Sequence, residues 1–202
     1  MKQKLVILGG GESGVGAAIL GQQKGYDVFV SDYGAIKDTY AQVLSSNQIN
    51  WEDRGHTVSE IIAADIVVKS PGIADVAPIV CSLKQAGVKV ISEIEFAAQF
   101  TDATIVAITG SNGKTSTASL TYALLKNDLN VALGGNIGDS FAAQVAAPGY
   151  ENFVLELSSF QLDGIEKFAP HIAVLTNLSP DHLDRHENSY QNYIASKFRI
   201  TM

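Results

Sequence analysis

Short runs of apolar, often β-branched residues alternate along the chain with longer segments whose apolar positions recur at helical spacing. This alternation is typical of βαβ units that build a parallel sheet. The apolar runs are nearly continuous, as expected for strands that are covered on both faces. The strands that the pattern predicts fall into two series, which are 4–8, 28–31, 66–69 and 89–91, and then 104–108, 131–133, 153–156 and 172–176.

Two series of strands imply two sheets within one chain. The short segment from Phe100 to Ala103 separates the series, and a glycine-rich turn follows the first strand of each. We therefore place a domain boundary near Thr101. The predicted fold class is α/β, with a Rossmann-like parallel-sheet domain over residues 1–101 and a second parallel-sheet domain that begins at 102 and reaches 202.

Composition narrows the class of protein. With 46% hydrophobic and 17% charged residues, the 202-residue chain has enough apolar material for buried cores. Its net charge of -7, without any run of Lys and Arg, argues against a nucleic-acid partner. The apolar stretch from Leu5 to Leu8 is too short for a signal sequence or a membrane span. The lone cysteine, Cys81, fits a reducing compartment, so we expect a cytoplasmic protein.

Polar and glycine-rich motifs follow the predicted strands at the points where these strands end. In open parallel sheets, ligands bind at the carboxyl edge, because loops and helix N-termini meet there. The placement therefore predicts one ligand-binding edge for each sheet. The motifs are Gly9 to Gly14, Asp32, Ser70 to Gly72, Thr109 to Ser116, Gly134 to Asn136, Glu156 to Ser159 and Asn177 to His182.

The first glycine motif predicts a ligand that carries phosphate. Gly9, Gly11 and Gly14 have the GxGxxG spacing, in which missing side chains let a diphosphate approach the amides of a helix N-terminus. Asp32 ends the next strand, where a dinucleotide site would place its ribose-binding carboxylate. A tight strand-to-helix turn would explain Gly9 but not the whole spacing. A nicotinamide dinucleotide therefore stays open as one of the possible ligands.

The second glycine motif has the chemistry of a nucleoside triphosphate site. Its amides would cradle phosphates, Lys114 would neutralise the β and γ charges, and the Thr115 hydroxyl would reach Mg²⁺. The general P-loop has its first glycine five residues before the Gly-Lys pair, whereas here Gly110 stands three before Gly113. This shortened loop resembles that of Mur ligases and folylpolyglutamate synthetases. The predicted nucleotide-binding residues are Gly110, Ser111, Asn112, Gly113, Lys114, Thr115 and Ser116.

Glu156 is a candidate metal ligand. It ends a strand of apolar residues, where an ionised carboxylate is unfavourable unless a cation or hydrogen bonds compensate it. Mg²⁺ takes carboxylate and phosphate oxygens together, so it is a suitable partner. The alternative is a capping role at the following helix, but Ser158 or Ser159 already supplies an oxygen for that purpose.

His182 is a second candidate ligand. It lies in a loop at the same sheet edge as Lys114 and Glu156, and this placement leaves a metal-binding role and that of an ordinary surface histidine equally open. The remaining histidines, at positions 56, 171 and 186, have no comparable support from their positions.

Lys197 falls on an apolar helical stripe. Ser189 can cap a helix in which Tyr190, Tyr193, Ile194 and Lys197 share one face. A lysine in such a stripe most often extends its ammonium into solvent, and this is the expectation from sequence alone. If the amine is buried instead, desolvation lowers its pKa, and the amine can capture CO₂ to form an anionic carbamate.

Taken together, these motifs resemble the Mur ligase family, and within it the members that add D-glutamate. The resemblance spans the whole chain in motif order and spacing. Its most distinctive segment is Glu-Leu-Ser-Ser-Phe-Gln-Leu, which begins at Glu156. The other segments that carry it are Gly110 to Thr115, Gly134 to Gly138, Asn177 to Arg185 and Lys197 to Ile200.

The resemblance implies specific roles. The first domain would bind UDP and not NAD, and the second would be the first part of a P-loop-type ATP-binding domain. Lys114, His182 and Lys197 would be catalytic. Thr115 and Glu156 would hold one Mg²⁺, and His182 with carbamylated Lys197 a second. The implied contacts to the nucleotide sugar are Glu12, Ser13, Asp32, Tyr33, Ser70 and Gly72 on the UDP side, and Asn136, Ser158 and His182 on the rest of the substrate.

The implied reaction is an ATP-dependent ligation. ATP would phosphorylate the L-alanyl carboxylate of UDP-N-acetylmuramoyl-L-alanine, and the amine of D-glutamate would attack the resulting acyl phosphate. Because family members continue well beyond the position of Met202, we expect this chain to be an inactive, monomeric fragment. The alternatives are another Mur ligase, a ligase similar to folylpolyglutamate synthetase, and a nicotinamide-dependent oxidoreductase.

Overall fold

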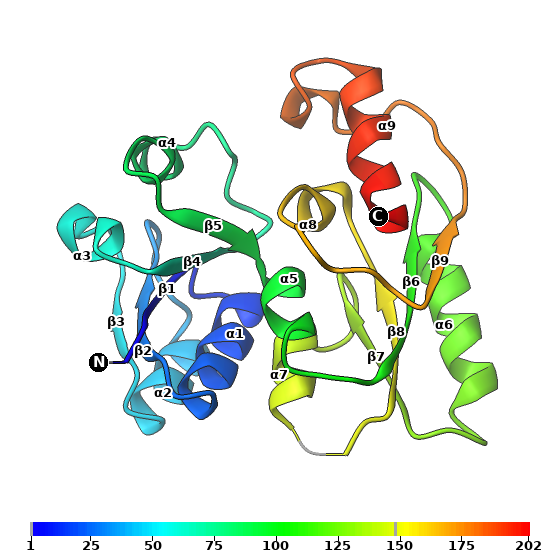
Figure 1. The fold of residues 1–202 in the computed structure, drawn as a ribbon, viewed down its shortest axis with the longest axis horizontal. Coiled ribbons are helices and arrows are strands. Elements are labelled where there is room, and N and C mark those ends of the chain that lie inside the picture. Colours follow the sequence, from blue (N-terminus) through cyan, green and yellow to red (C-terminus); the bar gives the residue numbers. More distant parts are fainter. Residues whose placement is uncertain (1, 148) are drawn as a thin grey trace.

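The computed structural model describes residues 2–147 and 149–202, and it contains two parallel sheets side by side (Figure 1). The first sheet has the strand order β3-β2-β1-β4-β5, and every neighbouring pair is parallel. Its elements are β1 (Lys4–Leu8), α1 (Glu12–Gln23), β2 (Asp27–Ser31), α2 (Asp38–Ser46), β3 (Asn50–Glu52), α3 (Val58–Ile62), β4 (Ile66–Lys69), α4 (Pro78–Gln85), β5 (Lys89–Ser92) and α5 (Glu93–Ala98).

The second sheet has the strand order β7-β8-β6-β9 and is also parallel throughout. The α/β class with parallel sheets is therefore confirmed. The assignment of the second sheet to a partial P-loop domain stays a prediction. Its elements are β6 (Thr104–Thr109), α6 (Lys114–Leu125), β7 (Val131–Gly135), α7 (Phe141–Ala146), β8 (Asn152–Glu156), α8 (Ser159–Asp163), β9 (Ile172–Leu175), η1 (Leu183–Arg185), α9 (Tyr190–Phe198) and η2 (Arg199–Thr201).

All the predicted strands are present, and their ends differ by at most two residues from the expected ones. Strand β3 was not predicted, because its residues Asn50, Trp51 and Glu52 carry no apolar run and lie at the exposed edge of the first sheet. The expectation that all strands are covered on both faces is wrong for β9. This strand is also an edge strand, and Ile172 at its start is 53% exposed.

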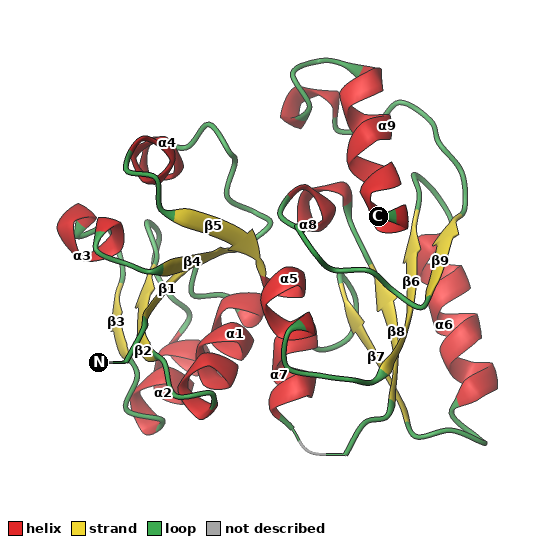
Figure 2. Ribbon diagram, viewed as in Figure 1, coloured by secondary structure: helices red, strands yellow, loops and turns green. Residues whose placement is uncertain are grey.

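The main hydrophobic core is shared by the two sheets. Helices α1, α5 and α7 lie between the sheets (Figure 2). Phe96 of α5 and Phe141 of α7 belong to the same core cluster as Leu5 of β1 and Phe153 of β8. Helices α1 and α7 approach so closely that a Cβ on Gly16 would lie 2.1 Å from Oγ of Ser140. The two sheets therefore share one packed interior.

Two buried glutamates on α5 make further contacts between the two sheet units. Glu95 is 2% exposed and accepts hydrogen bonds from the backbone amides of residues 166, 167 and 168, which follow α8. Glu93, also 2% exposed, accepts one from the amide of Ala142 in α7, while its Oε2 has no hydrogen-bond partner among the described residues. Helix α5 thus belongs by sequence to the first series but binds directly to the second sheet unit.

Loops that follow parallel strands gather at the carboxyl edge of each sheet. Every motif that the sequence placed after a strand therefore lies on one of two such edges. No helix within residues 2–147 and 149–202 is both long and apolar enough to cross a membrane.

Candidate functional site

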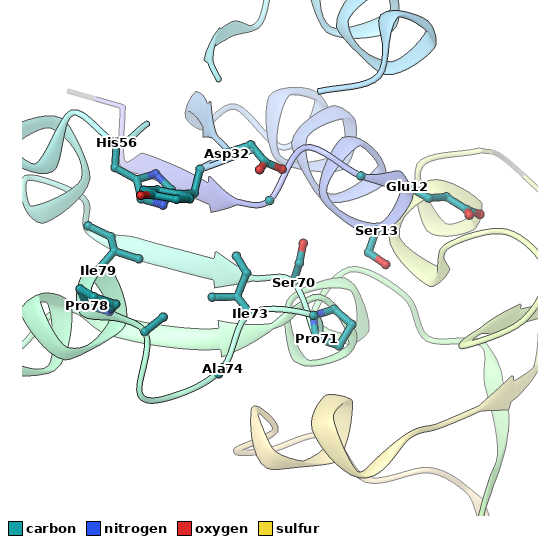
Figure 3. A pocket seen from close by; sticks show the side chains of 15 residues that line it. Glu12, Ser13, Asp32, His56, Ser70, Pro71, Ile73, Ala74, Pro78 and Ile79 are labelled. Carbon is teal, nitrogen blue, oxygen red and sulfur yellow. The ribbon is translucent and has the colours of Figure 1, made fainter. Parts of the chain in front are cut away.

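A pocket of about 770 Å³ opens at the carboxyl edge of the first sheet (Figure 3). The loops after β1, β2 and β4 form its walls. All six residues that were predicted to contact UDP line this one pocket, although they come from three different loops. They are Glu12, Ser13, Asp32, Tyr33, Ser70 and Gly72.

The glycine loop of this pocket has little freedom. A Cβ on Gly14 would lie 1.8 Å from the carbonyl oxygen of Gly9, so only glycine fits at that position. Asp32 holds the loop from the neighbouring strand, because its Oδ2 accepts a hydrogen bond of 2.7 Å from the amide of Gly10. Its Oδ1 accepts a second hydrogen bond, 2.8 Å long, from the amide of Gly34. Asp32, which was predicted to contact a ribose, thus uses both carboxylate oxygens to stabilise the loops around the pocket.

Sequence reasoning missed His56, which lines the same pocket. Its Nδ1 lies 2.7 Å from Oγ of Ser31, and its ring lies 5.7 Å from that of Tyr33, which is 79% exposed. The exposed Tyr33 ring and the His56 ring together offer an aromatic surface to a planar group. No strand-end motif contains His56, so only the three-dimensional packing identifies it.

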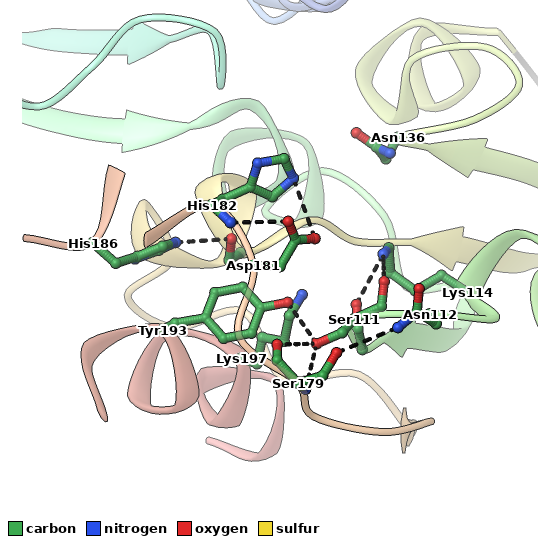
Figure 4. A network of polar contacts seen from close by, with 12 residues as sticks. Ser111, Asn112, Lys114, Asn136, Ser179, Asp181, His182, His186, Tyr193 and Lys197 are labelled. Carbon is green, nitrogen blue, oxygen red and sulfur yellow. Dashed lines mark hydrogen bonds and ion pairs between the residues drawn. The ribbon is translucent and has the colours of Figure 1, made fainter. Parts of the chain in front are cut away.

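The second glycine loop joins β6 to α6. Gly113 is the N-cap of α6 with φ 80°, and as a glycine it offers no side chain to cap the first amides of the helix. Helix α6 therefore has an N-terminus suited to an anion. Nζ of Lys114 donates hydrogen bonds to the carbonyl oxygens of Gly110 at 2.8 Å and Ser111 at 3.0 Å. The ammonium lies over the loop whose amides would cradle a phosphate (Figure 4).

The segment after β9 holds this loop in place. The side-chain oxygen of Asn177 accepts a hydrogen bond of 3.0 Å from the amide of Asn112, and the Ser111 hydroxyl donates one of 2.9 Å to the carbonyl of Ser179. The Ser111 hydroxyl also lies 2.8 Å from the Tyr193 hydroxyl of α9 (Figure 4). The predicted phosphate loop, the loop after β9 and helix α9 form one connected network.

Glu156, a predicted magnesium ligand, lies beside the hydroxyl of Thr115. It is 1% exposed at the end of β8, and its Oε2 accepts a hydrogen bond of 2.8 Å from the Thr115 hydroxyl. Its Oε1 accepts one of 2.9 Å from the side-chain amide of Asn136. The structure therefore places a carboxylate and a hydroxyl side by side at the start of α6. These are oxygen ligands of the type that Mg²⁺ prefers.

Ser158 has the capping role that the sequence suggested for Ser158 or Ser159. Its Oγ accepts a hydrogen bond of 3.3 Å from the amide of Gln161, and the Gln161 side chain accepts one of 2.9 Å from the amide of Ser158. This capping box starts α8, so the Glu156 carboxylate is not needed to cap the helix.

His182 is exposed and has a left-handed backbone conformation with φ 48°. Its Nε2 lies 3.6 Å from a carboxylate oxygen of Asp181 (Figure 4). Within residues 2–147 and 149–202, no group of three or more His, Cys, Asp or Glu side chains could hold a metal ion by itself. A metal bound at Glu156 or His182 would therefore take most of its ligands from phosphate, water or other residue types.

Lys197 does not extend into solvent, so the expectation of a solvated ammonium is wrong. The residue is 2% exposed, its Nζ lies 3.5 Å from the Thr109 hydroxyl, and the ammonium lies 4.8 Å from the ring centre of Tyr193. Burial, together with the positive charge of Lys114, lowers the pKa of Lys197 to about 8, although nearby carboxylates act in the opposite direction. The side chain is held by α9 in the interior beside the end of β6.

A group of aromatic rings supports this side of the site, and its members include His186, which was not predicted to belong to the site. His186 is 6% exposed, stacks on Phe160 at 5.6 Å and meets the edge of Tyr193 at 5.4 Å. Phe160 in turn lies 5.3 Å from the ring of His182. Burial lowers the pKa of His186, although the carboxylate of Asp163 acts in the opposite direction. His186 follows His182 by four positions, but only the packing around Phe160 and Tyr193 brings it into the site.

Two family models match this chain in succession. Residues 4–79 match the MurD N-terminal domain, and residues 108–202 match the Mur ligase middle domain. Solved structures support the same fold. A UDP-N-acetylmuramate:L-alanyl-gamma-D-glutamyl-meso-diaminopimelate ligase from Neisseria meningitides has a TM-score of 0.65 at 20% identity, over 100% of this chain and 69% of that one. The UDP-N-acetylmuramate-alanine ligase MurC from Thermotoga maritima has a TM-score of 0.62 at 22% identity, over 98% of this chain and 46% of that one.

Curated relatives are much closer in sequence. Proteins named UDP-N-acetylmuramoylalanine–D-glutamate ligase from Christiangramia forsetii and Bacteroides thetaiotaomicron are 59% and 56% identical to it. These matches cover 99% and 98% of this chain and 45% of each relative, so the chain spans less than half of their length. The two family matches, the sequence similarity over almost the whole length of this chain and the shared fold agree with one another. The chain belongs to the Mur ligase family.

Proposed function

We propose that this chain forms the nucleotide-sugar-binding part and the first ATP-binding part of a ligase that adds D-glutamate to UDP-N-acetylmuramoyl-L-alanine. One observation supports the proposal above the others. Two glycine loops that suit phosphates lie at the carboxyl edges of adjoining sheets, and the Thr115 hydroxyl at the end of the second loop is hydrogen-bonded to Glu156. The relatives that carry the name of this activity are 59% and 56% identical to the chain.

The first pocket suits the UDP portion of the substrate. The loop from Gly9 to Gly14 presents backbone amides at the start of α1, where a diphosphate would be stabilised. Tyr33 and His56 offer rings against which a uracil could lie. Asn136 and His182 belong to the second sheet unit, and we propose that they contact the muramoyl and L-alanyl part.

The second loop suits the phosphates of ATP. Lys114 would exchange its contacts with the loop carbonyls for contacts with phosphate oxygens, and the amides at the start of α6 would bind the same group. Thr115 and Glu156 would hold one Mg²⁺. When bound, this cation offsets the charge that makes the γ-phosphate and the L-alanyl carboxylate repel each other.

We further propose that Lys197, as a carbamate, and His182 hold a second Mg²⁺. The neutral Lys197 amine would add to the carbon of CO₂ and release one proton to solvent, which converts a neutral amine into an anionic oxygen ligand. The burial of Lys197 supports this step, because an amine in such surroundings is unprotonated more often than an exposed one.

We propose that the two domains meet near Thr101, between the end of α5 and the start of β6. We expect the protein to act as a monomer in the cytoplasm, where ATP and the nucleotide sugar are available. Analytical ultracentrifugation of the chain would test the oligomeric state, and a species of twice the chain mass would contradict it.

Calorimetric titration of the chain with UDP-N-acetylmuramoyl-L-alanine, UDP and NADH tests the proposal. We expect the nucleotide sugar to bind more tightly than UDP, because it can reach both sheet units, and UDP to bind more tightly than NADH. A nicotinamide-dependent oxidoreductase would show the opposite preference. Tighter binding of NADH than of UDP would therefore show that the proposed ligand of the first pocket is wrong.

A further inference from the structure

Arg185 connects the two sheet units at the edge of the first pocket. It ends η1, which follows β9 of the second sheet. Its Nη2 donates a hydrogen bond of 3.2 Å to the carbonyl oxygen of Pro71, which lies in the loop after β4 of the first sheet. Pro71 lines the first pocket together with Ser70 and Gly72, on either side of it in sequence (Figure 3).

The same side chain also contacts the group around His182. The guanidinium carbon of Arg185 lies 4.4 Å from the ring centre of Phe160, and this ring lies 5.3 Å from that of His182. The backbone amide of Arg185 donates a hydrogen bond of 3.0 Å to the carbonyl of His182. A planar guanidinium can cover an aromatic face and donate from its edge at the same time, which a lysine ammonium cannot do.

Other polar contacts between the units lie away from this pocket. The hydrogen bonds of Glu93 and Glu95, and that from the amide of Ser92 to the carbonyl of Gly164, involve the end of β5 and the start of α5. A salt bridge of 2.7 Å joins Lys89, at the start of β5, to Glu166. None of these residues lines the first pocket. They hold the sheets together away from the ligand. The Arg185 contact is made by a loop that would touch the ligand itself.

We propose that Arg185 is a positioning residue that couples the loop from Ser70 to Gly72 to the loop that carries His182. The inference rests on the proposed function, since it assigns one ligand to both loops. With Arg185 in place, the two loops keep a fixed separation before the ligand binds, so a ligand that extends from the first pocket to His182 does not have to order them. UDP alone occupies only the first pocket and gains nothing from this coupling.

The substitution Arg185→Lys tests the coupling, and Arg199→Lys is the matched control. Arg199 also donates to backbone carbonyls, those of Leu162 and Ile165, but all three residues belong to the second sheet unit. For each variant, calorimetry gives the affinities for UDP and for UDP-N-acetylmuramoyl-L-alanine, and thermal unfolding gives the midpoint temperature.

We expect Arg185→Lys to lower the affinity for UDP-N-acetylmuramoyl-L-alanine by about 10-fold, as the loss of one charge-assisted hydrogen bond does, and to change that for UDP by less than about two-fold. Arg199→Lys should leave the ratio of the two affinities as in the unsubstituted chain, even where it lowers the midpoint temperature. A merely structural role of Arg185 would lower the midpoint without changing this ratio.

Two outcomes would overturn the inference. An equal loss of affinity for both ligands would mean that Arg185 supports the first pocket alone, and no loss for either would mean that its contact with Pro71 has no effect on binding. The proposed function fails in a different way. In that case the unsubstituted chain itself would bind UDP-N-acetylmuramoyl-L-alanine no more tightly than UDP.

Discussion

The hydroxyl of Thr115 lies 2.8 Å from Oε2 of Glu156, so the first turn of α6 and the end of β8 meet at a pair of side-chain oxygens. The carboxylate is 1% exposed, and its other oxygen accepts a hydrogen bond from Asn136. These two bonds stabilise the charge and fix the direction of the carboxylate. Glu156 is therefore oriented before any cation arrives.

The substitution Glu156→Gln should remove the magnesium dependence of ATP binding. An amide keeps the size of the side chain but not the charge that a hard cation requires. In the unsubstituted chain, we expect removal of Mg²⁺ with EDTA to weaken ATP binding by about 10-fold or more, which corresponds to at least ~1.4 kcal/mol. In the variant, ATP should bind weakly with or without Mg²⁺. Isothermal titration calorimetry measures both affinities.

The control is Glu151→Gln, which removes an exposed carboxylate next to the start of β8. This variant should keep the magnesium dependence of the unsubstituted chain. If Glu156→Gln also kept it, then Glu156 would not be a magnesium ligand, and its burial would have a structural explanation only.

The substitution Lys114→Ala should weaken ATP binding without a comparable effect on adenosine. The ammonium lies over the loop carbonyls of Gly110 and Ser111, at the place where the β and γ phosphates would need a counter-charge. We expect a loss of about 100-fold for ATP, or ~2.7 kcal/mol. Competition binding with a fluorescent nucleotide measures it. Lys126→Ala, at the other end of α6, is the control, and an equal loss there would mean that only the overall charge matters.

Glu93 should make the stability of the chain depend on pH. Burial raises its pKa from 4.5 to about 7, a hydrogen bond from the amide of Ala142 partly opposes this, and the charge of Glu12 adds to it. Between these two pH values, the folded chain binds more protons at this site than the unfolded chain does. The free energy of unfolding therefore falls as the pH rises from 4.5 through 7, and it stays low above 7.

Urea unfolding of the chain and of its Glu93→Gln variant, compared between pH 5 and 8, tests this prediction. The glutamine has no titrating proton, so the difference in the free energy of unfolding should shift in favour of the variant by roughly 3 kcal/mol as the pH rises. Parallel pH profiles for the two chains would show that Glu93 is ionised in the folded protein throughout this range.

The parts of the site that the sequence predicted are those that depend on local order along the chain. A strand that runs into glycines and then into a helix specifies its own glycine loop, as it does at Gly9 and at Gly110. Because all strands of each sheet are parallel, the residues that end the strands come together at one edge. Asp32 and Glu156 were found in this way.

The other parts depend on packing between distant segments, for which a single sequence carries no local signal. His56 lines the first pocket from the loop after the unpredicted strand β3, and Arg185 meets a carbonyl 114 positions earlier in the chain. Lys197 shows the same limit. The helical stripe placed it correctly on α9, but only the packing of Tyr193 and β6 around it shows that the amine is buried.

The last prediction concerns Lys197 in the whole enzyme. If it carries a carbamate, Lys197→Ala should be nearly inactive, because the variant lacks the anionic ligand for the second Mg²⁺. Short carboxylic acids such as acetate should partly restore turnover, since they can place a carboxylate in the space that the side chain leaves. Lys197→Arg should stay inactive, because a guanidinium keeps its positive charge and cannot react with CO₂. Steady-state turnover with and without added acid measures all three effects.

The carbamate on Lys197 can also be detected without an activity assay. Carbon-13 NMR of the enzyme in labelled bicarbonate should show one carbamate signal that is absent from Lys197→Ala and present in the control Lys126→Ala, whose side chain lies over Tyr122 at the end of α6. A lysine needed only for its positive charge would give the reverse set of results. Arginine would then replace it with nearly full turnover, added acids would not help, and no carbamate signal would appear, because the buried cation would act through its charge over the Tyr193 ring.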